Sequence, residues 1–131
     1  VRPMVKTLQE AGIEVSVFVD PELEQVKASH KLDVRAVEIN TAAWSDAGDH
    51  RARETALRKV NDAARLARRL GLEVHAGHGL TYGNVGPIAA VTEIVELNIG
   101  HSIVARALLV GMSEAVRKMA RAMREGRAGR V

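Results

Sequence analysis

The stretch Val15-Ser16-Val17-Phe18-Val19-Asp20 places a valine at every second position. Side chains alternate between the two faces of an extended strand, so the three valines share one face and Ser16, Phe18 and Asp20 share the other. Three further segments, each bounded by turn-forming residues, show the same alternation: residues 36–40, 73–77 and 96–100. We therefore expect four strands, near 15–19, 36–40, 73–77 and 96–100, each with one apolar face.

Stretches with helical spacing of apolar residues separate these segments. The clearest covers residues 51–70, and Gly71 ends it. A shorter helix is expected to begin at Pro21 with Asp20 as its cap, and another is expected over 102–109. Strands that alternate with helices predict a parallel sheet with crossover connections.

The second face of the expected sheet is polar, which favours one parallel architecture over another. In a doubly wound sheet helices cover both faces, and the strands become nearly continuous apolar runs. In a closed barrel only the outer face packs on helices, and the inner face can be polar where a site occupies its top. A barrel explains the polar residues better, namely Asp20, Glu38, Asn40, Glu73, His75, Glu96 and Asn98.

The fold class expected from these patterns is α/β, a (β/α)8 TIM barrel of which the chain holds about the last four βα units. Such barrels typically need roughly 250 residues, and the chain has 131. Residues 1–125 are expected to form this C-terminal half, and 126–131 a basic, disordered tail. Because a half-barrel exposes strand edges, we expect it to pair with the missing N-terminal half, with a second copy as a homo-oligomer, or with neighbouring chains.

The composition of the chain limits the classes of partner that it is expected to bind. The chain has a net charge of +3, no cysteine and one each of Trp, Tyr and Phe. Few aromatic residues leave little for nucleic-acid bases to stack on, so we expect the basic residues near the C-terminus to be a solvated helix face. No apolar run approaches the roughly 20 residues that cross a bilayer. We expect no membrane or nucleic-acid partner and a cytoplasmic location.

Candidate site residues follow the strands, where parallel barrels place their chemistry. The segment from Asn98 through Gly100 into a helix suits a phosphate, because free N–H groups of a first helical turn favour anions. Gly79 and Gly100 would be its backbone contributors. Gly100 is equally compatible with a tight turn, and His101 with a helix cap.

Two side chains are candidates for catalysis. His78 lies between two glycines, with little packing reason to be there, and imidazole exchanges protons near neutral pH. Glu38 lies on the polar strand face, where a carboxylate needs a partner or a positively charged substrate. His75, His78 and His101 do not form a metal-binding motif, so no metal is expected.

Four segments together resemble a known family. They are Val15-Ser16-Val17-Phe18-Val19-Asp20-Pro21, Ala36-Val37-Glu38-Ile39-Asn40-Thr41, Ala76-Gly77-His78-Gly79-Leu80-Thr81-Tyr82 and Glu96-Leu97-Asn98-Ile99-Gly100-His101-Ser102-Ile103. In this order they resemble the second half of the pyridoxine 5′-phosphate synthase family, and the resemblance covers all but the basic tail. His75 stands where that family usually has Asn.

The resemblance implies a function in vitamin B6 biosynthesis. Members of the family are (β/α)8 barrels that condense 1-deoxy-D-xylulose 5-phosphate with 3-amino-2-oxopropyl phosphate, closing a pyridine ring without a metal or redox cofactor. It implies that His78 donates a proton in ring closure and that Glu38 stabilises charge in the transition state. It implies that Gly79, Gly100 and His101 hold the phosphate of the product. The family's remaining acid–base residues belong to the first four units, so this chain alone is expected to be inactive.

Two alternatives stay open on the sequence. One is another phosphosugar-binding TIM barrel, an isomerase or aldolase, which would use the same glycine–helix site with a different proton-transfer pair. The other is a non-enzymatic half-barrel module that exists to assemble with a partner.

Overall fold

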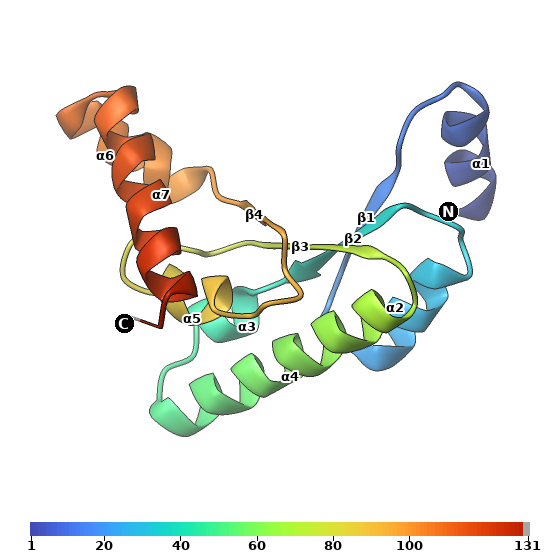
Figure 1. Ribbon diagram of the computed structural model, residues 1–131, viewed down its shortest axis with the longest axis horizontal. Coiled ribbons are helices and arrows are strands. Elements are labelled where there is room, and N and C mark those ends of the chain that lie inside the picture. Colours follow the sequence, from blue (N-terminus) through green and yellow to red (C-terminus); the bar gives the residue numbers. More distant parts are fainter. Residues whose placement is uncertain (130–131) are drawn as a thin grey trace.

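Four parallel strands form one sheet in the order β1-β2-β3-β4 in the computed structural model, which describes residues 1–129 (Figure 1). Each strand pairs with the next one along the chain, and Val17, Val37 and Val74 lie side by side in the register. The four expected strands are confirmed, with bounds β1 Ser16–Val19, β2 Ala36–Asn40, β3 Glu73–Gly77 and β4 Glu96–Asn98.

Helices connect the strands and extend beyond both ends of the sheet. Their bounds are α1 Arg2–Glu10, α2 Leu23–His30, α3 Ala42–Ser45, α4 His50–Arg69, α5 Val85–Ala89, α6 His101–Val110 and α7 Met112–Arg127. Because every strand-to-strand connection contains helix, the predicted parallel α/β arrangement is confirmed.

The hydrophobic core lies on one face of the sheet. Ile39 and Val74 are fully buried there against helix α4, whose inward residues Val60 and Ala63 are buried in the same cluster. Figure 1 shows α2, α3, α4 and α5 on this side of the strands, with α1 and the α6–α7 pair at opposite ends. On the other face Phe18 is 54% exposed. The expected one-sided packing is therefore present in the described part of the chain.

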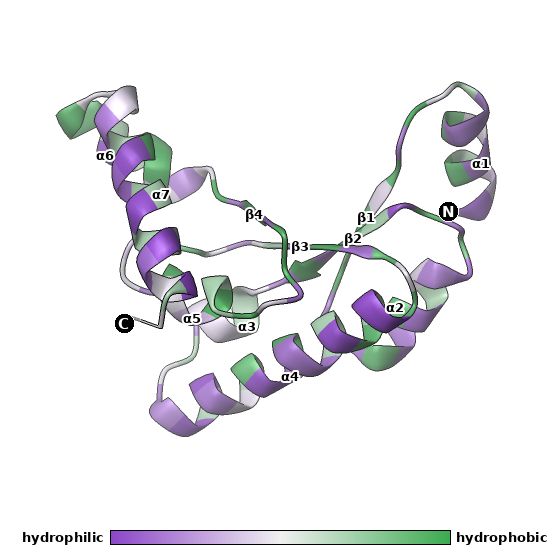
Figure 2. Cartoon of the chain, viewed as in Figure 1, coloured by the Kyte–Doolittle hydropathy of each residue, from purple (hydrophilic) through white to green (hydrophobic). Residues whose placement is uncertain are grey.

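Helix α4 forms where the apolar spacing predicts it. It spans 20 residues, and its N-cap Asp49 accepts a hydrogen bond from the backbone N–H of Ala52 at 2.8 Å. Its colours in Figure 2 alternate between hydrophilic and hydrophobic along its length, as expected of a helix with one buried stripe. Within residues 1–129, no helix is both long and apolar enough to cross a membrane.

The start of α2 differs from the prediction. The helix begins at Leu23 with Glu22 as its N-cap, two residues after Pro21. The prediction that Asp20 caps this helix is wrong, because its Oδ1 instead accepts a hydrogen bond from Asn40 Nδ2 at 2.9 Å. Asp20 thus joins the ends of β1 and β2.

Helix α7 extends two residues into the range predicted as a basic tail. Arg127 holds its last turn in place by donating to the carbonyl oxygens of Val91 and Ile94, each at 2.8 Å. Gly126 is buried against the backbone of Gly86 in α5. The last part of the predicted tail, 130–131, lies outside the described residues.

Candidate active site

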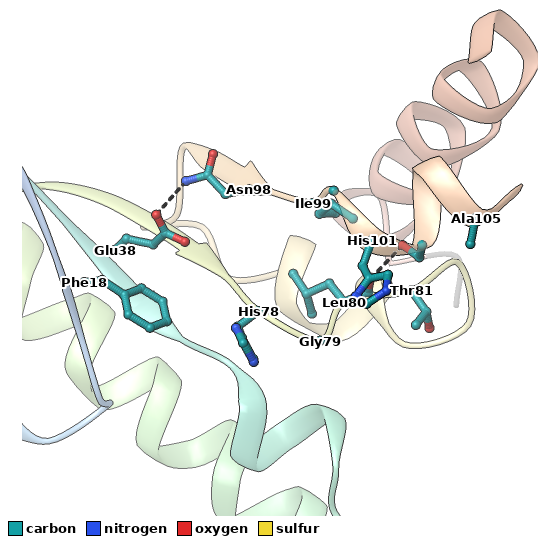
Figure 3. Close-up of a pocket in the computed structure, with 12 residues that line it drawn as sticks. Phe18, Glu38, His78, Gly79, Leu80, Thr81, Asn98, Ile99, His101 and Ala105 are labelled. Carbon is teal, nitrogen blue, oxygen red and sulfur yellow. Dashed lines mark hydrogen bonds between the residues drawn. The ribbon is translucent and has the colours of Figure 1, made fainter. Parts of the chain in front are cut away.

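A cleft of about 550 Å³ opens at the carboxyl ends of the strands. Its residues come from β1, β2, the loop after β3, and the passage from β4 into α6 (Figure 3). Parallel strands bring their carboxyl ends to one edge, which explains how residues far apart in the sequence meet there. The lining includes all five sequence-predicted site residues: Glu38, His78, Gly79, Gly100 and His101.

The Glu38 carboxylate is held across the neighbouring strand. Its Oε2 accepts a hydrogen bond from Asn98 Nδ2 at 2.9 Å, so the side chain extends from β2 over β3 to β4 (Figure 3). The space between is free because β3 has Gly77 there. A Cβ atom on Gly77 would lie 2.5 Å from Glu38 Oε1 and 2.8 Å from the Asn98 carbonyl oxygen.

His78 is exposed and has an unusual backbone conformation. Its φ is 85°, in the left-handed region that non-glycine residues rarely adopt. The imidazole lies 6.3 Å from the ring of Phe18, centroid to centroid. Such strain persists where surrounding structure enforces it, and it concentrates at functional sites.

The two glycines beside the cleft differ in whether the fold requires glycine at their positions. Gly79 has a φ of +74°, and a Cβ atom there would lie 2.6 Å from Ser45 Cβ, so the fold itself requires glycine. Gly100 has a φ of −112°, which any residue adopts, and a Cβ atom there would meet nothing within 4 Å. A tight turn therefore does not account for Gly100.

Helix α6 begins at the cleft with its first N–H groups free. His101 is its first residue and is exposed; Gly100 is the N-cap, without a side-chain capping bond. Among residues 1–129, the N–H groups of Gly79 and Leu80 in the facing loop also donate to no protein acceptor. Ser102 Oγ donates to the Leu80 carbonyl oxygen at 2.8 Å and ties the helix start to that loop. Unpaired amides beside a helix N-terminus make the region suitable for an anion.

Other polar residues of the sheet do not join this cleft. His75 Nε2 lies 3.1 Å from Glu73 Oε1, and its Nδ1 lies 3.7 Å from Glu96 Oε1. The hydrogen bond with His75 is the main cause that lowers the pKa of Glu73 below its ordinary value. His75 thus contacts carboxylates rather than His78. Among residues 1–129, no three histidine or acidic side chains are grouped to hold a metal ion.

Sequence reasoning did not predict Phe18 as a member of the site, and it placed Asn98 in the phosphate segment without the contact that Asn98 makes with Glu38. Both were placed on the polar strand face. The strand register brings Asn98 close to Glu38, whereas the loop after β3 brings the His78 ring to 6.3 Å from that of Phe18. The signal available for Asn98 was its position two strands from Glu38 with a glycine, Gly77, on the strand between them.

The sequence model of the family described as pyridoxal phosphate biosynthesis protein PdxJ matches residues 1–125. The chain belongs to this family. The match covers each residue that lines the cleft, so the Glu38, His78 and α6 geometry is that of a PdxJ chain.

Curated relatives of this PdxJ chain are named pyridoxine 5′-phosphate synthase. The protein of Syntrophotalea carbinolica is 53% identical over 88% of this chain and 48% of its own length. The protein of Magnetococcus marinus is 50% identical over 92% of this chain and 50% of its own length. The protein of Legionella pneumophila (strain Corby) is 46% identical over 97% of this chain and 51% of its own length. The chain thus spans about half the length of the curated relatives it matches.

A solved structure supports the fold of this PdxJ chain. A chain of the Amycolatopsis orientalis BexX/CysO complex superposes with a TM-score of 0.64 at 17% identity, covering 98% of this chain and 49% of that one. At this identity the similarity concerns the fold alone.

Proposed function

We propose that this chain carries the ring-closing half of the active site of a pyridoxine 5′-phosphate synthase, a transferase-type enzyme of vitamin B6 biosynthesis. The reaction would condense 1-deoxy-D-xylulose 5-phosphate with 3-amino-2-oxopropyl phosphate and release phosphate and water. The observation that carries the proposal is a single cleft in a PdxJ chain that joins a strained histidine, a tethered carboxylate and a free helix N-terminus.

His78 would donate protons to departing oxygens. Condensation and dehydration both need a proton at the leaving hydroxyl, and an exposed imidazole beside the cleft can deliver it. Glu38 would stabilise positive charge on imine-like intermediates. Its hydrogen bond to Asn98 holds the carboxylate in place before the charge develops, so little reorganisation is needed.

Gly79, Gly100 and His101 would bind the phosphate retained in the product. The free amides of the Gly79 loop and of the first turn of α6 are donors that require no rearrangement. The open space at Gly100 leaves room for phosphate oxygens to approach the backbone. No metal or redox cofactor enters this scheme.

The proposal also covers the complete barrel to which this chain would belong. Residues 1–125 would be the last four units of a (β/α)8 barrel, with the uncovered face that carries Phe18 turned toward its interior. The N-terminal half of the relatives' fold would close the barrel and supply the remaining acid–base groups, so the isolated chain would be inactive. A homo-oligomer in the cytoplasm is proposed for the assembled enzyme, and the lack of cysteine suits a reducing compartment.

A chimera tests the proposal directly. This chain would replace the matching C-terminal half of the 53% identical Syntrophotalea carbinolica protein, and pyridoxine 5′-phosphate would be measured with both substrates. We expect product from the chimera and none from this chain alone. A folded chimera that forms no product would overturn the proposal, and turnover of a phosphosugar without ring closure would favour an isomerase or aldolase.

Two variants of the chimera separate the proposed roles. His78→Asn should lower kcat by about 100-fold or more, as loss of a general acid does, while the affinity for inorganic phosphate stays nearly unchanged. Gly100→Val should leave the fold intact, because its side chain enters open space, yet weaken phosphate binding. Phosphate affinity is measured by amide shifts in NMR titrations. If His78→Asn loses phosphate affinity as well, the histidine is a ligand rather than the donor.

A further inference from the structure

The positive φ of His78 needs a structural cause. A non-glycine residue in the left-handed region carries backbone strain, and His78 has a φ of 85°. It is exposed, so burial of its own side chain does not hold it there. The restraint must come from contacts to its backbone.

Thr41 supplies the shortest of these contacts. Its hydroxyl oxygen lies 2.6 Å from the carbonyl oxygen of His78 and 2.8 Å from that of Gly77. The Gly77 carbonyl also accepts the backbone N–H of Thr41 at 2.8 Å. A hydroxyl has one proton, and Gly77 already has a donor, so the Thr41 hydroxyl serves chiefly the His78 carbonyl.

Thr41 is itself rigidly placed. It is fully buried, it follows β2 directly, and its carbonyl oxygen accepts the N–H groups of Trp44 and Ser45 in α3. Glu38 lies on β2, three residues before Thr41. Thr41 therefore links the strand that carries the candidate carboxylate to the loop that carries the candidate acid.

Ser45 makes a weaker contact with the same carbonyl. Its Oγ lies 3.3 Å from the His78 carbonyl oxygen, at the long end of hydrogen-bond geometry, and it is part-exposed. Since its Cβ packs where a Gly79 side chain would lie, Ser45 mainly fills space under the loop. It offers a matched control for the Thr41 hydroxyl.

We propose that Thr41 is a positioning residue for ring closure: its buried hydroxyl fixes the His78 backbone and so directs the imidazole into the cleft beside Phe18. The proposal rests on the proposed function for its catalytic consequence. Displacing a catalytic group by about 1 Å can cost on the order of 100-fold in rate. The hydroxyl does not touch the substrate, so its removal should act on kcat rather than on substrate affinity.

The first experiment measures the position of the His78 ring and does not depend on catalytic activity. The chain has one phenylalanine and five histidines, so the nuclear Overhauser effect between the Phe18 and His78 rings is assigned by its absence in His78→Asn. We expect this signal in the parent chain, in Thr41→Ser and in Ser45→Ala, and its loss in Thr41→Val, which keeps the volume but not the hydroxyl. A folded Thr41→Val chain that retains the signal would overturn the proposal. If that variant fails to fold, Thr41→Cys, a weak donor of similar size, takes its place with the same expectation.

The second experiment measures kcat and KM in the chimera. Thr41→Val should lower kcat by about 10- to 100-fold with KM within about twofold, and Thr41→Ser should restore most of it. An unchanged kcat together with a lost Phe18–His78 signal would refute the catalytic role. If the parent chimera makes no product at all, the proposed function fails, whereas the ring signals still decide whether Thr41 positions His78.

Discussion

At the scale of the residue, Gly77 shows how the absence of a side chain can hold a neighbour in place. The Glu38 carboxylate passes over β3 at this position to reach Asn98 Nδ2 at 2.9 Å. Two of the atoms nearest to an added Cβ are Glu38 Oε1 at 2.5 Å and the Asn98 carbonyl oxygen at 2.8 Å. The first can swing away, but the second belongs to the backbone of the adjacent strand.

We therefore predict that Gly77→Ala breaks the Glu38–Asn98 hydrogen bond and moves β4. The clash should lower the free energy of unfolding by about 1–3 kcal/mol, as overpacking of a close contact does. Urea denaturation measures this, and in the chimera kcat should fall as well. Gly83→Ala is the control, because a Cβ atom there meets nothing within 4 Å. Equal stability of the two variants would contradict the prediction.

The residue scale also shows what the sequence could predict. His78 and Glu38 stood out because glycines flank one and the other is a carboxylate on a strand, both local signals. The Asn98 contact joins residues 60 positions apart, and the Thr41 contact with His78 joins residues 37 apart. Their importance depends on strand register and on a positive φ, which no local pattern reveals.

At the scale of the element, α7 approaches α5 more closely than a side chain would allow. A Cβ atom on Gly126 would lie 2.6 Å from both Cα and the carbonyl oxygen of Gly86. The approach lets Arg127 reach the carbonyl oxygens of Val91 and Ile94 between α5 and β4. One glycine thus permits the contact that locks the end of the last described helix.

We predict that Gly126→Ala destabilises the fold although alanine favours helix. The gain in helix propensity is at most about 1 kcal/mol, whereas the clash is with backbone atoms that cannot rotate away and should cost about 2–3 kcal/mol. Thermal unfolding should show a lower Tm. Gly48→Ala, where a Cβ atom meets nothing within 4 Å, should leave the Tm almost unchanged. A Tm that rises in Gly126→Ala would show that α7 can shift freely.

Elements differed in how well the sequence predicted them. The strands and α4 were found because a period of two, or a long stripe such as Val60 and Ala63, repeats often enough to be recognised. Helices α3 and α5 have 4 and 5 residues, too few for a period to emerge. The start of α2 was misplaced because the Asp20–Asn40 bond between strands took the side chain that local rules assign to a cap.

At the scale of the whole molecule, several surface carboxylates titrate below the ordinary glutamate value of 4.5. A hydrogen bond from Lys27 lowers the pKa of Glu24, one with His75 lowers that of Glu73, and one from Arg117 lowers that of Glu114. Each group holds its proton less tightly in the folded state than in the unfolded state. These pairs therefore contribute stability above about pH 4.5, and the contribution is lost as the pH falls through the folded values.

We predict that the Tm declines as the pH is lowered from 7 to 3, and that the decline is shallower in the triple variant Glu24→Gln, Glu73→Gln, Glu114→Gln. Added salt should also weaken the dependence, because exposed pairs are screened. Thermal unfolding followed by circular dichroism at each pH provides the measurement. A Tm profile identical in the parent and the triple variant would show that these pairs do not contribute.

The spatial order β1-β2-β3-β4 repeats the order of the strands in the chain. Each strand therefore finds its partner in the segment synthesised just before it, separated only by the intervening helical connection. A nascent chain leaving the ribosome can add one unit at a time to an edge that already exists, without waiting for a distant segment. Growth by successive addition keeps the loop-closure entropy of each step small.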